Sequence, residues 1–379
     1  MEKELHIICP DVPCPADYGC VIDIMNRIRA LHAAGIRIHL HYFSDNQCTI
    51  PIELTSFCRS VYLYAPRAKK QCGNNALPYN IAARINDLLI GRLNADDHPI
   101  LIEGLSCTGI IPFLKNIRRS VCIRMHTNEE LYYKALAQTS SGIFKKFYYA
   151  AEGRHIKKYI ATLPKQTLLA CVSEPDRFFF KELGFNNAFF LPTFPNWQRV
   201  NSLEGIGTHC LFHGTLSVPD NEQAALWLLH KVFNKVRVPF IIAGKDPSRQ
   251  LQKAAALCEH TCLVSNPCES EINDLVQKAH INILPNLNKN CTGTRLKLLH
   301  ALYSGRHCVT TPSMIAESGL EATCHIGTTP NALASIISQL YYKPFEADEI
   351  HLRKTLVEKT FNNSRNTACL MNQLWLPTP

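Results

Sequence analysis

The sequence predicts an α/β protein built from two doubly wound halves. A chain of 379 residues is longer than the roughly 250–300 residues at which a single hydrophobic core stops growing. Short apolar runs alternate with amphipathic stretches, which is the pattern of βαβ units around a parallel sheet. Charged residues make up only 19% of the chain, which suits strands covered on both faces.

The first half, residues 1–195, contains six apolar runs that we expect to be strands. They are Leu5–Cys9, Arg37–Phe43, Val61–Tyr64, Ile100–Glu103, Val121–Met125 and Leu168–Ser173. Apolar residues from Val21 to Leu31 recur at helical spacing between the first two strands, and Gly35 ends this helix as a left-handed cap.

A break at residues 192–197, with two prolines in four residues, predicts a hinge before the second half. The alternation restarts over residues 205–350. Strands are expected at His209–Phe212, Phe240–Ala243, Cys262–Ser265, Ile281–Leu284 and Cys308–Thr310. Helices are expected at Glu222–Phe233, Arg249–Cys258, Thr294–Ser304 and Ala332–Tyr341. Residues 351–379 should form C-terminal helices that pack back toward the first half, within a tail that is helical from Asp348 to Leu374.

Composition narrows the compartment and the partners. The net charge of +9 is compatible with nucleic acid, anionic lipid or a phosphorylated small molecule, and no motif supports nucleic acid. Seventeen scattered cysteines without a CxxC pair, several of them inside expected strands, predict reduced thiols and a cytoplasmic protein. The chain start resembles no signal peptide, and the apolar runs are too short to cross a bilayer.

The turn after the strand at 209–212 is the first candidate site. Gly214 allows another group to approach the backbone, and Thr215 and Ser217 offer hydroxyl groups. Ser217 followed by Asp220 resembles a helix cap, so an ordinary capped turn explains the same residues. There is neither a GxGxxG after Cys9 nor a GxxxxGK[ST], which disfavours a dinucleotide dehydrogenase or a P-loop enzyme.

A second candidate site follows the strand at 281–284. Gly293 and Thr294 open an expected helix whose free N–H groups favour an anion. Arg295 and Lys297 add positive charge at this end, where cations oppose the helix dipole. A bound diphosphate would explain them, and a solvated basic turn is the alternative. Lys245 is either a further phosphate contact or an exposed loop residue.

Five segments in order along the chain resemble motifs of the GT-B glycosyltransferases of the large retaining family 4 (glycosyl transferases group 1), in a bacterial branch. The segments are Asp17–Cys20, Arg124–Tyr133, Cys171–Asp176, Gly214–Asn221 and Gly293–Leu302. The second is similar to RxHNxExxYY and the last to GTRxKxLEAL. The resemblance implies two Rossmann-like domains facing each other across a cleft. It also implies transfer of a sugar from a nucleotide-sugar to an acceptor with retention of configuration.

The resemblance also implies residue roles. The catalytic residues would be His126, beside the donor sugar, with Arg295 and Lys297 at the diphosphate. The donor and its nucleotide would be bound by Gly214, Thr215, Ser217, Gly244, Lys245, Gly293, Thr294, His300 and Glu317. The acceptor side would be formed by Asp17, Tyr18, Gly19 and Glu129. Glu317 could instead cap the next helix.

The chain departs from the family pattern at the Glu-x7-Glu pair, which would fall on Thr292 and His300. The second Glu usually holds the nucleotide ribose, so His300 either does this differently or has no ligand. Cys20 stands where the family's acceptor loop has a second glycine. No Asp-x-Asp motif is present, so we expect no catalytic metal and no cofactor; Arg295, Lys297 and the helix N–H groups would stabilise the leaving diphosphate.

The stretch from Phe144 to Lys165 is basic and aromatic, and it could lie on anionic lipid or be an ordinary solvated helix. Lipid contact would suit a polyprenyl-linked acceptor. We therefore expect a hexosyltransferase that acts on a glycan or lipid-linked acceptor in cell-surface polysaccharide or glycoconjugate synthesis, peripheral on the inner face of the cytoplasmic membrane. The alternatives are an inactive GT-B-like protein that binds nucleotide or glycan, and, third, a nucleotide-sugar epimerase.

Overall fold

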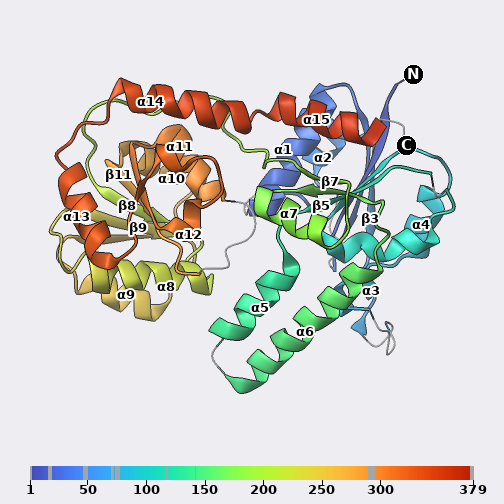
Figure 1. Ribbon diagram of the computed structural model, residues 1–379, viewed down its shortest axis with the longest axis horizontal. Coiled ribbons are helices and arrows are strands. Elements are labelled where there is room, and N and C mark those ends of the chain that lie inside the picture. Colours follow the sequence, from blue (N-terminus) through green and yellow to red (C-terminus); the bar gives the residue numbers. More distant parts are fainter. Residues whose placement is uncertain are drawn as a thin grey trace. The chain divides into compact units, whose positions relative to one another are not determined.

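The structure is a computed structural model that describes residues 2–15, 19–45, 50–69, 72, 77–116, 118–140, 142–288 and 295–375. The described residues divide into two compact units. Unit 1 comprises those up to 196 and those from 361 on, and unit 2 comprises those from 197 to 360. Each unit is a parallel sheet covered by helices (Figure 1), which confirms the predicted α/β class with two doubly wound halves.

Unit 1 contains a seven-stranded sheet in the order β3-β2-β1-β4-β5-β6-β7. Its strands are β1 (Glu4–Cys9), β2 (Arg37–Phe43), β3 (Ser60–Tyr64), β4 (Ile100–Glu103), β5 (Val121–Met125), β6 (Leu168–Cys171) and β7 (Ala188–Phe190). Its helices are α1 (Gly19–Ala33), α2 (Ile52–Phe57), α3 (Tyr79–Ala82), α4 (Asp87–Leu93), η2 (Leu105–Phe113), α5 (Glu129–Thr139), α6 (Ile143–Thr162), α7 (Glu174–Glu182) and α15 (Asn363–Trp375). All of the strand pairs are parallel.

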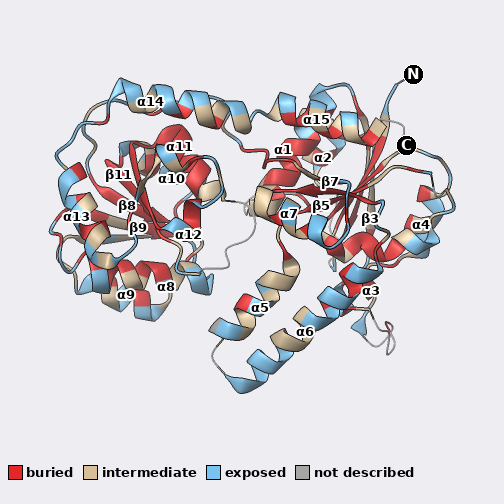
Figure 2. Cartoon of the chain, in the orientation of Figure 1, coloured by how far each residue is buried: buried red, intermediate tan, exposed pale blue. Residues whose placement is uncertain are grey.

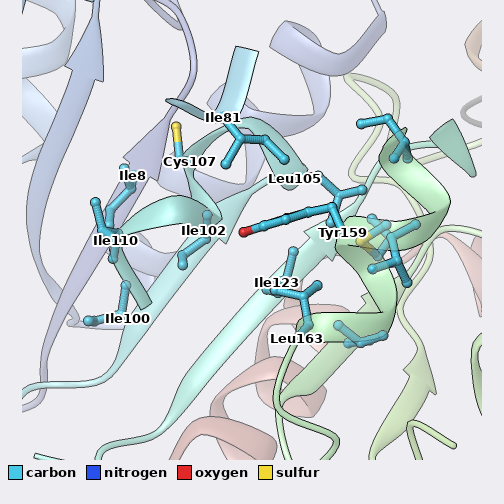
Figure 3. Packing of buried hydrophobic residues seen from close by; sticks show 14 of the residues in the cluster. Ile8, Ile81, Ile100, Ile102, Leu105, Cys107, Ile110, Ile123, Tyr159 and Leu163 are labelled. Atoms are coloured by element: carbon cyan, nitrogen blue, oxygen red, sulfur yellow. The ribbon is translucent and has the colours of Figure 1, made fainter. Parts of the chain in front are cut away.

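Apolar side chains fill both faces of the unit 1 sheet. On one face, residues of β4 and β5 such as Ile102 and Ile123 pack against η2 and against Tyr159 of α6 (Figure 3). The Tyr159 hydroxyl remains hydrogen-bonded, 2.7 Å from the hydroxyl of Thr108. On the other face, α1 packs with the C-terminal helix α15, whose Leu370 is fully buried. The last helix therefore completes the core of the N-terminal sheet.

Unit 2 contains a six-stranded sheet in the order β10-β9-β8-β11-β12-β13. Its strands are β8 (Cys210–His213), β9 (Phe240–Gly244), β10 (Thr261–Ser265), β11 (Ile281–Leu284), β12 (His307–Thr310) and β13 (His325–Ile326). Its helices are α8 (Pro219–Trp227), η3 (Leu228–Val232), α9 (Arg249–Ala256), α10 (Glu269–Lys278), α11 (Leu296–Ser304), α12 (Pro312–Ile315), η4 (Glu321–Thr323), α13 (Pro330–Leu340), α14 (Ala347–Arg353) and η5 (Lys354–Glu358).

The structure corrects three local expectations. The tail from Asp348 to Leu374 is not one helix, because Asn362 interrupts it and caps α15 by accepting a hydrogen bond from the backbone of Arg365 at 2.9 Å. Strand β6 ends before Ser173, which instead caps α7. The short edge strands β7 and β13 are additional.

The α5–α6 hairpin extends away from the sheet of unit 1 (Figure 1), and its exposed residues lie mainly on α6, whereas most of α5 is partly buried (Figure 2). Phe144 is 88% exposed and Phe147 is 67% exposed, which is unusual for phenylalanine. Among the described residues, none of the helices is long and apolar enough to span a membrane.

The described cysteines are all free thiols, as the sequence predicts. Those expected inside strands are buried, namely Cys9, Cys122, Cys171, Cys210 and Cys308.

Candidate active site

The carboxyl ends of β8 and β9 lie in close backbone contact at two glycines of the predicted donor site. A Cβ atom on Gly244 would lie 1.8 Å from the carbonyl oxygen of Gly214, so only glycine fits there. The turn after β8 is then tied to Lys245, whose carbonyl accepts from the backbone of Leu216 at 2.8 Å and of Ser217 at 3.3 Å. The predicted residues of these two turns are therefore neighbours.

Helix α8 begins differently from the prediction. Its cap residue is Val218, without a side-chain hydrogen bond, and Pro219 occupies the first helical position. Ser217 is exposed and precedes the cap, so the expected Ser217–Asp220 capping arrangement is wrong. Thr215 is half-buried, and its carbonyl accepts from Asn221 at 3.0 Å.

Lys297, in the first turn of α11, connects that helix to the turn after β8. Its Nζ donates to the side-chain oxygen of Asn221 at 2.9 Å and lies 5.4 Å from the centre of the Phe212 ring. Asn221 closes the turn, and a Cβ on Gly214 would lie 3.2 Å from its amide nitrogen. The structure thus brings together two segments that are 76 positions apart in the sequence.

Arg295 connects the start of α11 to the loop that carries Glu317. Its guanidinium donates to the carbonyl of Ala316 at 3.1 Å. Glu317 is exposed and has a left-handed backbone with φ of 56°, a conformation that costs a non-glycine residue free energy and is found most often at functional sites. Gly293 and Thr294, predicted beside Arg295, lie outside the described residues.

The other end of α11 is capped by a buried guanidinium. Arg353 of α14 is 1% exposed and donates to the carbonyls of Gly305 at 2.6 Å and Leu302 at 3.4 Å. A positive charge at this end complements the helix dipole. The result is that α11 is held firmly, with its N-terminal turn at the carboxyl edge of the sheet, where open α/β sheets bind ligands.

His300 lies inside unit 2. Its ring stacks on Trp197, with centroids 4.3 Å apart, and meets the ring of His213 edge-on at 5.6 Å. Burial lowers the pKa of His300 to about 4 and the pKa of His213 well below its usual value, so both rings are neutral at pH 7. The Nε2 atoms of both rings are buried and make no hydrogen bond within the described structure.

In unit 1, His126 follows β5 and borders a buried cluster of charged side chains. Its Nε2 donates to Glu103 at 2.8 Å, and its Nδ1 lies 3.5 Å from an Asp23 carboxylate oxygen. Arg27 donates to that Asp23 oxygen at 2.8 Å and to Glu103 at 2.6 Å, and Arg124 donates to Asp23 at 3.2 Å. Both ring nitrogens of His126 therefore face buried carboxylates, and its side chain is 14% exposed.

The opposite charges of this cluster stabilise one another in their ionised forms. Burial alone would raise the pKa of Asp23, but Arg124 and Arg27 outweigh it and lower that pKa. The pKa of Glu103 is lowered as well, by Arg27 and His126 against the effect of burial. Two carboxylates and two guanidiniums thus stay ionised with almost no exposure to water. Sequence reasoning missed Asp23, Arg27 and Glu103, although their positions inside apolar segments were a signal.

Of the predicted acceptor-side residues, Gly19 begins α1, while Asp17 and Tyr18 lie outside the described residues. Glu129 begins α5 and is half-buried. Burial raises the pKa of Glu129 to about 7, only partly offset by a hydrogen bond from the backbone of Leu105. It is a carboxyl group that can exchange a proton near neutral pH.

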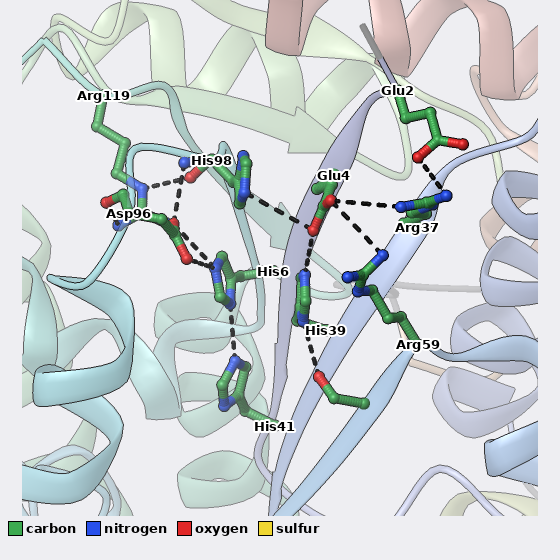
Figure 4. Close-up of polar contacts among 11 residues, drawn as sticks. Glu2, Glu4, His6, Arg37, His39, His41, Arg59, Asp96, His98 and Arg119 are labelled. Atoms are coloured by element: carbon green, nitrogen blue, oxygen red, sulfur yellow. Dashed lines mark hydrogen bonds and ion pairs between the residues drawn. The ribbon is translucent and has the colours of Figure 1, made fainter.

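A second polar cluster in unit 1 lies toward the starts of β1 and β2 (Figure 4). His6 hydrogen-bonds His41 at 2.8 Å and Asp96 at 3.0 Å, and His39 donates to Glu4 at 2.7 Å. Burial lowers the pKa of His6 to about 4. Because ligands bind at the carboxyl ends of parallel strands, we assign this cluster to stability and not to the site.

The chain as a whole has the GT-B fold of glycosyltransferases. Residues 207–343, most of unit 2, match the model of the family of glycosyl transferases group 1. A relative in Klebsiella pneumoniae, an uncharacterized 44.6 kDa protein in the cps region, is 26% identical over 328 residues, or 81% of this chain and 82% of that protein. The fold inferred from the sequence motifs is thereby confirmed, and the resemblance to the family is matched over residues 207–343.

Solved structures show the same fold along the whole chain. S. aureus TarM, crystallised as a mutant with fondaparinux, α-GlcNAc-glycerol and UDP, has a TM-score of 0.68 at 10% identity and covers 99% of this chain and 100% of its own. The sucrose-phosphate synthase of Thermosynechococcus elongatus also has a TM-score of 0.68, at 14% identity and 98% coverage of both chains.

Proposed function

We propose that the protein is a retaining, metal-independent glycosyltransferase that moves a hexose from a nucleotide-sugar to a glycan or lipid-linked acceptor in cell-surface polysaccharide synthesis. The observation that carries this proposal is that Lys297, at the start of α11, contacts the Gly214 turn through Asn221, while Arg295 in the same segment contacts the loop that carries Glu317. Both lie in the region that matches the group 1 family. The origin of the Klebsiella relative in a cps region supports the role in polysaccharide synthesis.

Arg295 and Lys297 would stabilise the diphosphate as it leaves. Arg295 donates to a carbonyl oxygen and Lys297 to an amide oxygen, so both cations are held in position at this edge of the sheet. Charge that develops on the β-phosphate during cleavage is stabilised best by donors that are already fixed in position. The same donors would fix the orientation of the nucleotide.

His300 would hold the nucleotide in place of the family's glutamate. It is neutral, its ring is fixed by stacking on Trp197, and its buried Nε2 has capacity for one hydrogen bond. A ribose hydroxyl could fill that capacity, because a hydroxyl both donates and accepts. We therefore propose that the ribose contact is made by a neutral ring nitrogen.

His126 would act through its position. Its Nε2 already donates to Glu103 and its Nδ1 faces Asp23, so neither nitrogen is placed to take a proton from an acceptor. Retention without a protein base agrees with such a histidine. On the acceptor side, Glu129 is the group best suited to hydrogen-bond the acceptor hydroxyl, because its pKa is about 7.

We further propose that α6 contacts anionic lipid. Its first turn exposes Ile143, Phe144 and Phe147 beside the exposed Lys145 and Lys146. Apolar and basic side chains side by side suit the interface of an anionic membrane. An enzyme bound to the membrane through α6 would have access to a polyprenyl-linked acceptor in that membrane.

The experiment is calorimetric titration with UDP, GDP and ADP. UDP is the first choice because TarM was crystallised with it. Arg295→Ala should weaken diphosphate binding by about 10- to 100-fold, because a hydrogen bond to a charged group contributes about 1.5–3 kcal/mol. Arg237→Ala, an exposed arginine before β9, is the matched control and should bind like wild type. If the protein binds none of the three nucleotides, the proposal is contradicted.

The inactive alternative is tested by turnover. Donors of the nucleotide that binds are incubated with a panel of glycan and lipid-linked acceptors. Product that the wild type forms and Arg295→Ala does not form establishes sugar transfer. Nucleotide binding by the wild type without any product favours a binding protein.

A further inference from the structure

Three potential metal ligands meet on one side of unit 2, at the end of the sheet opposite the candidate donor site. His307 begins β12, His325 begins β13, and Glu349 lies on α14. One ligand atom from each lies within 4.8 Å of the other two. The donor site lies at the carboxyl ends of the same strands, so this group is separate from it.

The hydrogen bonds of His307 determine where its ring protons are. The residue is fully buried, and its Nε2 lies 3.0 Å from the carbonyl oxygen of Lys343. A carbonyl can only accept, so Nε2 carries a proton, and in the neutral ring Nδ1 presents a lone pair. This Nδ1 is buried, has no hydrogen-bond partner in the described structure, and lies 3.4 Å from a Glu349 carboxylate oxygen.

A lone pair that faces a carboxylate across 3.4 Å is repulsive unless positive charge lies between them. His325 points its Nε2 at the same carboxylate oxygen, from 3.8 Å. Three electron-pair donors therefore converge on one point.

We propose that His307, His325 and Glu349 bind a divalent transition-metal cation, with Zn²⁺ as the best fit. Ligand atoms around a tetrahedral Zn²⁺ with bonds of about 2.0–2.2 Å lie about 3.4 Å apart, close to the separations of 3.4 and 3.8 Å here. Two imidazoles and a carboxylate are ligands that Zn²⁺ accepts. The side chains of His325 and Glu349 are 34% and 28% exposed, which leaves an entry route and room for a water as fourth ligand.

The metal would fasten α14 to strands β12 and β13 and takes no part in sugar transfer. Arg353 and Lys343 oppose a positive charge near His325, although Arg353 is held by carbonyls at the end of α11. The proposal does not depend on the proposed function, because its readout is metal binding.

The test is titration of the EDTA-treated full chain with Zn²⁺, by calorimetry and by competition with a chromophoric chelator. Cys262→Ser and Cys268→Ser remove, from the background of every variant, the two thiols that are exposed among the described residues. Glu349→Gln and His325→Ala should each weaken one Zn²⁺ site by more than about 100-fold, since even loss of an outer-shell partner costs about 10- to 100-fold. Glu349→Gln retains an oxygen for the helix cap at Glu346, so its fold is preserved.

Asp348→Asn and His351→Ala, exposed residues of the same helix, are the matched controls and should bind Zn²⁺ like wild type. The melting temperature should rise with Zn²⁺ in wild type and controls and stay constant in the two ligand variants. Mg²⁺, which prefers oxygen ligands, should not compete. Absence of Zn²⁺ binding by the wild type, or wild-type Zn²⁺ affinity in both Glu349→Gln and His325→Ala, overturns the proposal.

Discussion

The charged residues around His126 in unit 1 and those at the start of α11 in unit 2 differ in burial and in partners. Asp23, Arg27, Glu103 and Arg124 are at most 1% exposed and neutralise one another. Arg295 and Lys297 are half-buried and donate to neutral oxygens. Internally paired charges position groups and support the fold, whereas a cation such as Arg295, which donates to a carbonyl oxygen, keeps its attraction for an anion from outside.

The largest effect should follow from breaking the buried cluster. Asp23→Asn leaves two buried guanidiniums with a single carboxylate, so the free energy of unfolding should fall by about 3–5 kcal/mol. Urea denaturation measures this loss in the free energy of unfolding. The control is Glu174→Gln, which removes a surface partner of Arg177 and should cost at most about 1 kcal/mol. Equal losses in the two variants would mean that the cluster is no more important than a surface pair.

A smaller effect should appear on acidification, in the histidine cluster of Figure 4. The folded pKa of His6 is lowered to about 4 from a usual value of 6.5, so only the unfolded chain is protonated between these values. The free energy of unfolding should therefore fall as the pH drops from 6.5 to 4, by up to about 3 kcal/mol. His6→Gln should flatten this profile, and His155→Gln, at an exposed position, should leave it unchanged.

The smallest effect should come from the contact between the two turns of unit 2. Gly244→Ala places a methyl group 1.8 Å from the Gly214 carbonyl oxygen, so the turns must separate. We expect a loss of about 1–3 kcal/mol in stability, as for other overpacked sites, together with weaker nucleotide binding. Gly91→Ala on α4, where the added Cβ meets nothing within 4 Å, should not lower stability. Wild-type nucleotide affinity in Gly244→Ala would show that the turn is not part of the site.

The strands could be predicted well because buried parallel strands are continuous apolar runs. The bounds of β2, β4, β5 and β11 agree with the expected ranges. Strands β7 and β13 were missed because runs of three and two residues carry no usable pattern. The start of α8 was misassigned because a Ser-x-x-Asp pattern forms a cap only if the chain turns at the serine, and here it turns one residue later, at Val218.

Only those residues of the site that lie in a recognisable sequence motif could be predicted. The Gly214 turn and the start of α11 were found by sequence, but their link through Asn221 and Lys297 is a tertiary contact. The charges of Asp23 and Glu103 inside apolar segments were a signal of burial, but their contacts with His126 are tertiary and no local pattern pairs them. The surroundings of His300 likewise depend on Trp197, which reaches it from the predicted hinge.

Helix α15 has a consequence for the order in which the protein can fold during synthesis. Its Leu370 and Leu374 fill the core of unit 1 beside α1, yet they leave the ribosome after all of unit 2. The part of the apolar face of α1 that α15 covers therefore stays open while some 340 further residues are made. The described residues of unit 2 all precede α15 in the chain, so unit 2 can become native first. The N-terminal half of this chain is thus the later one to mature.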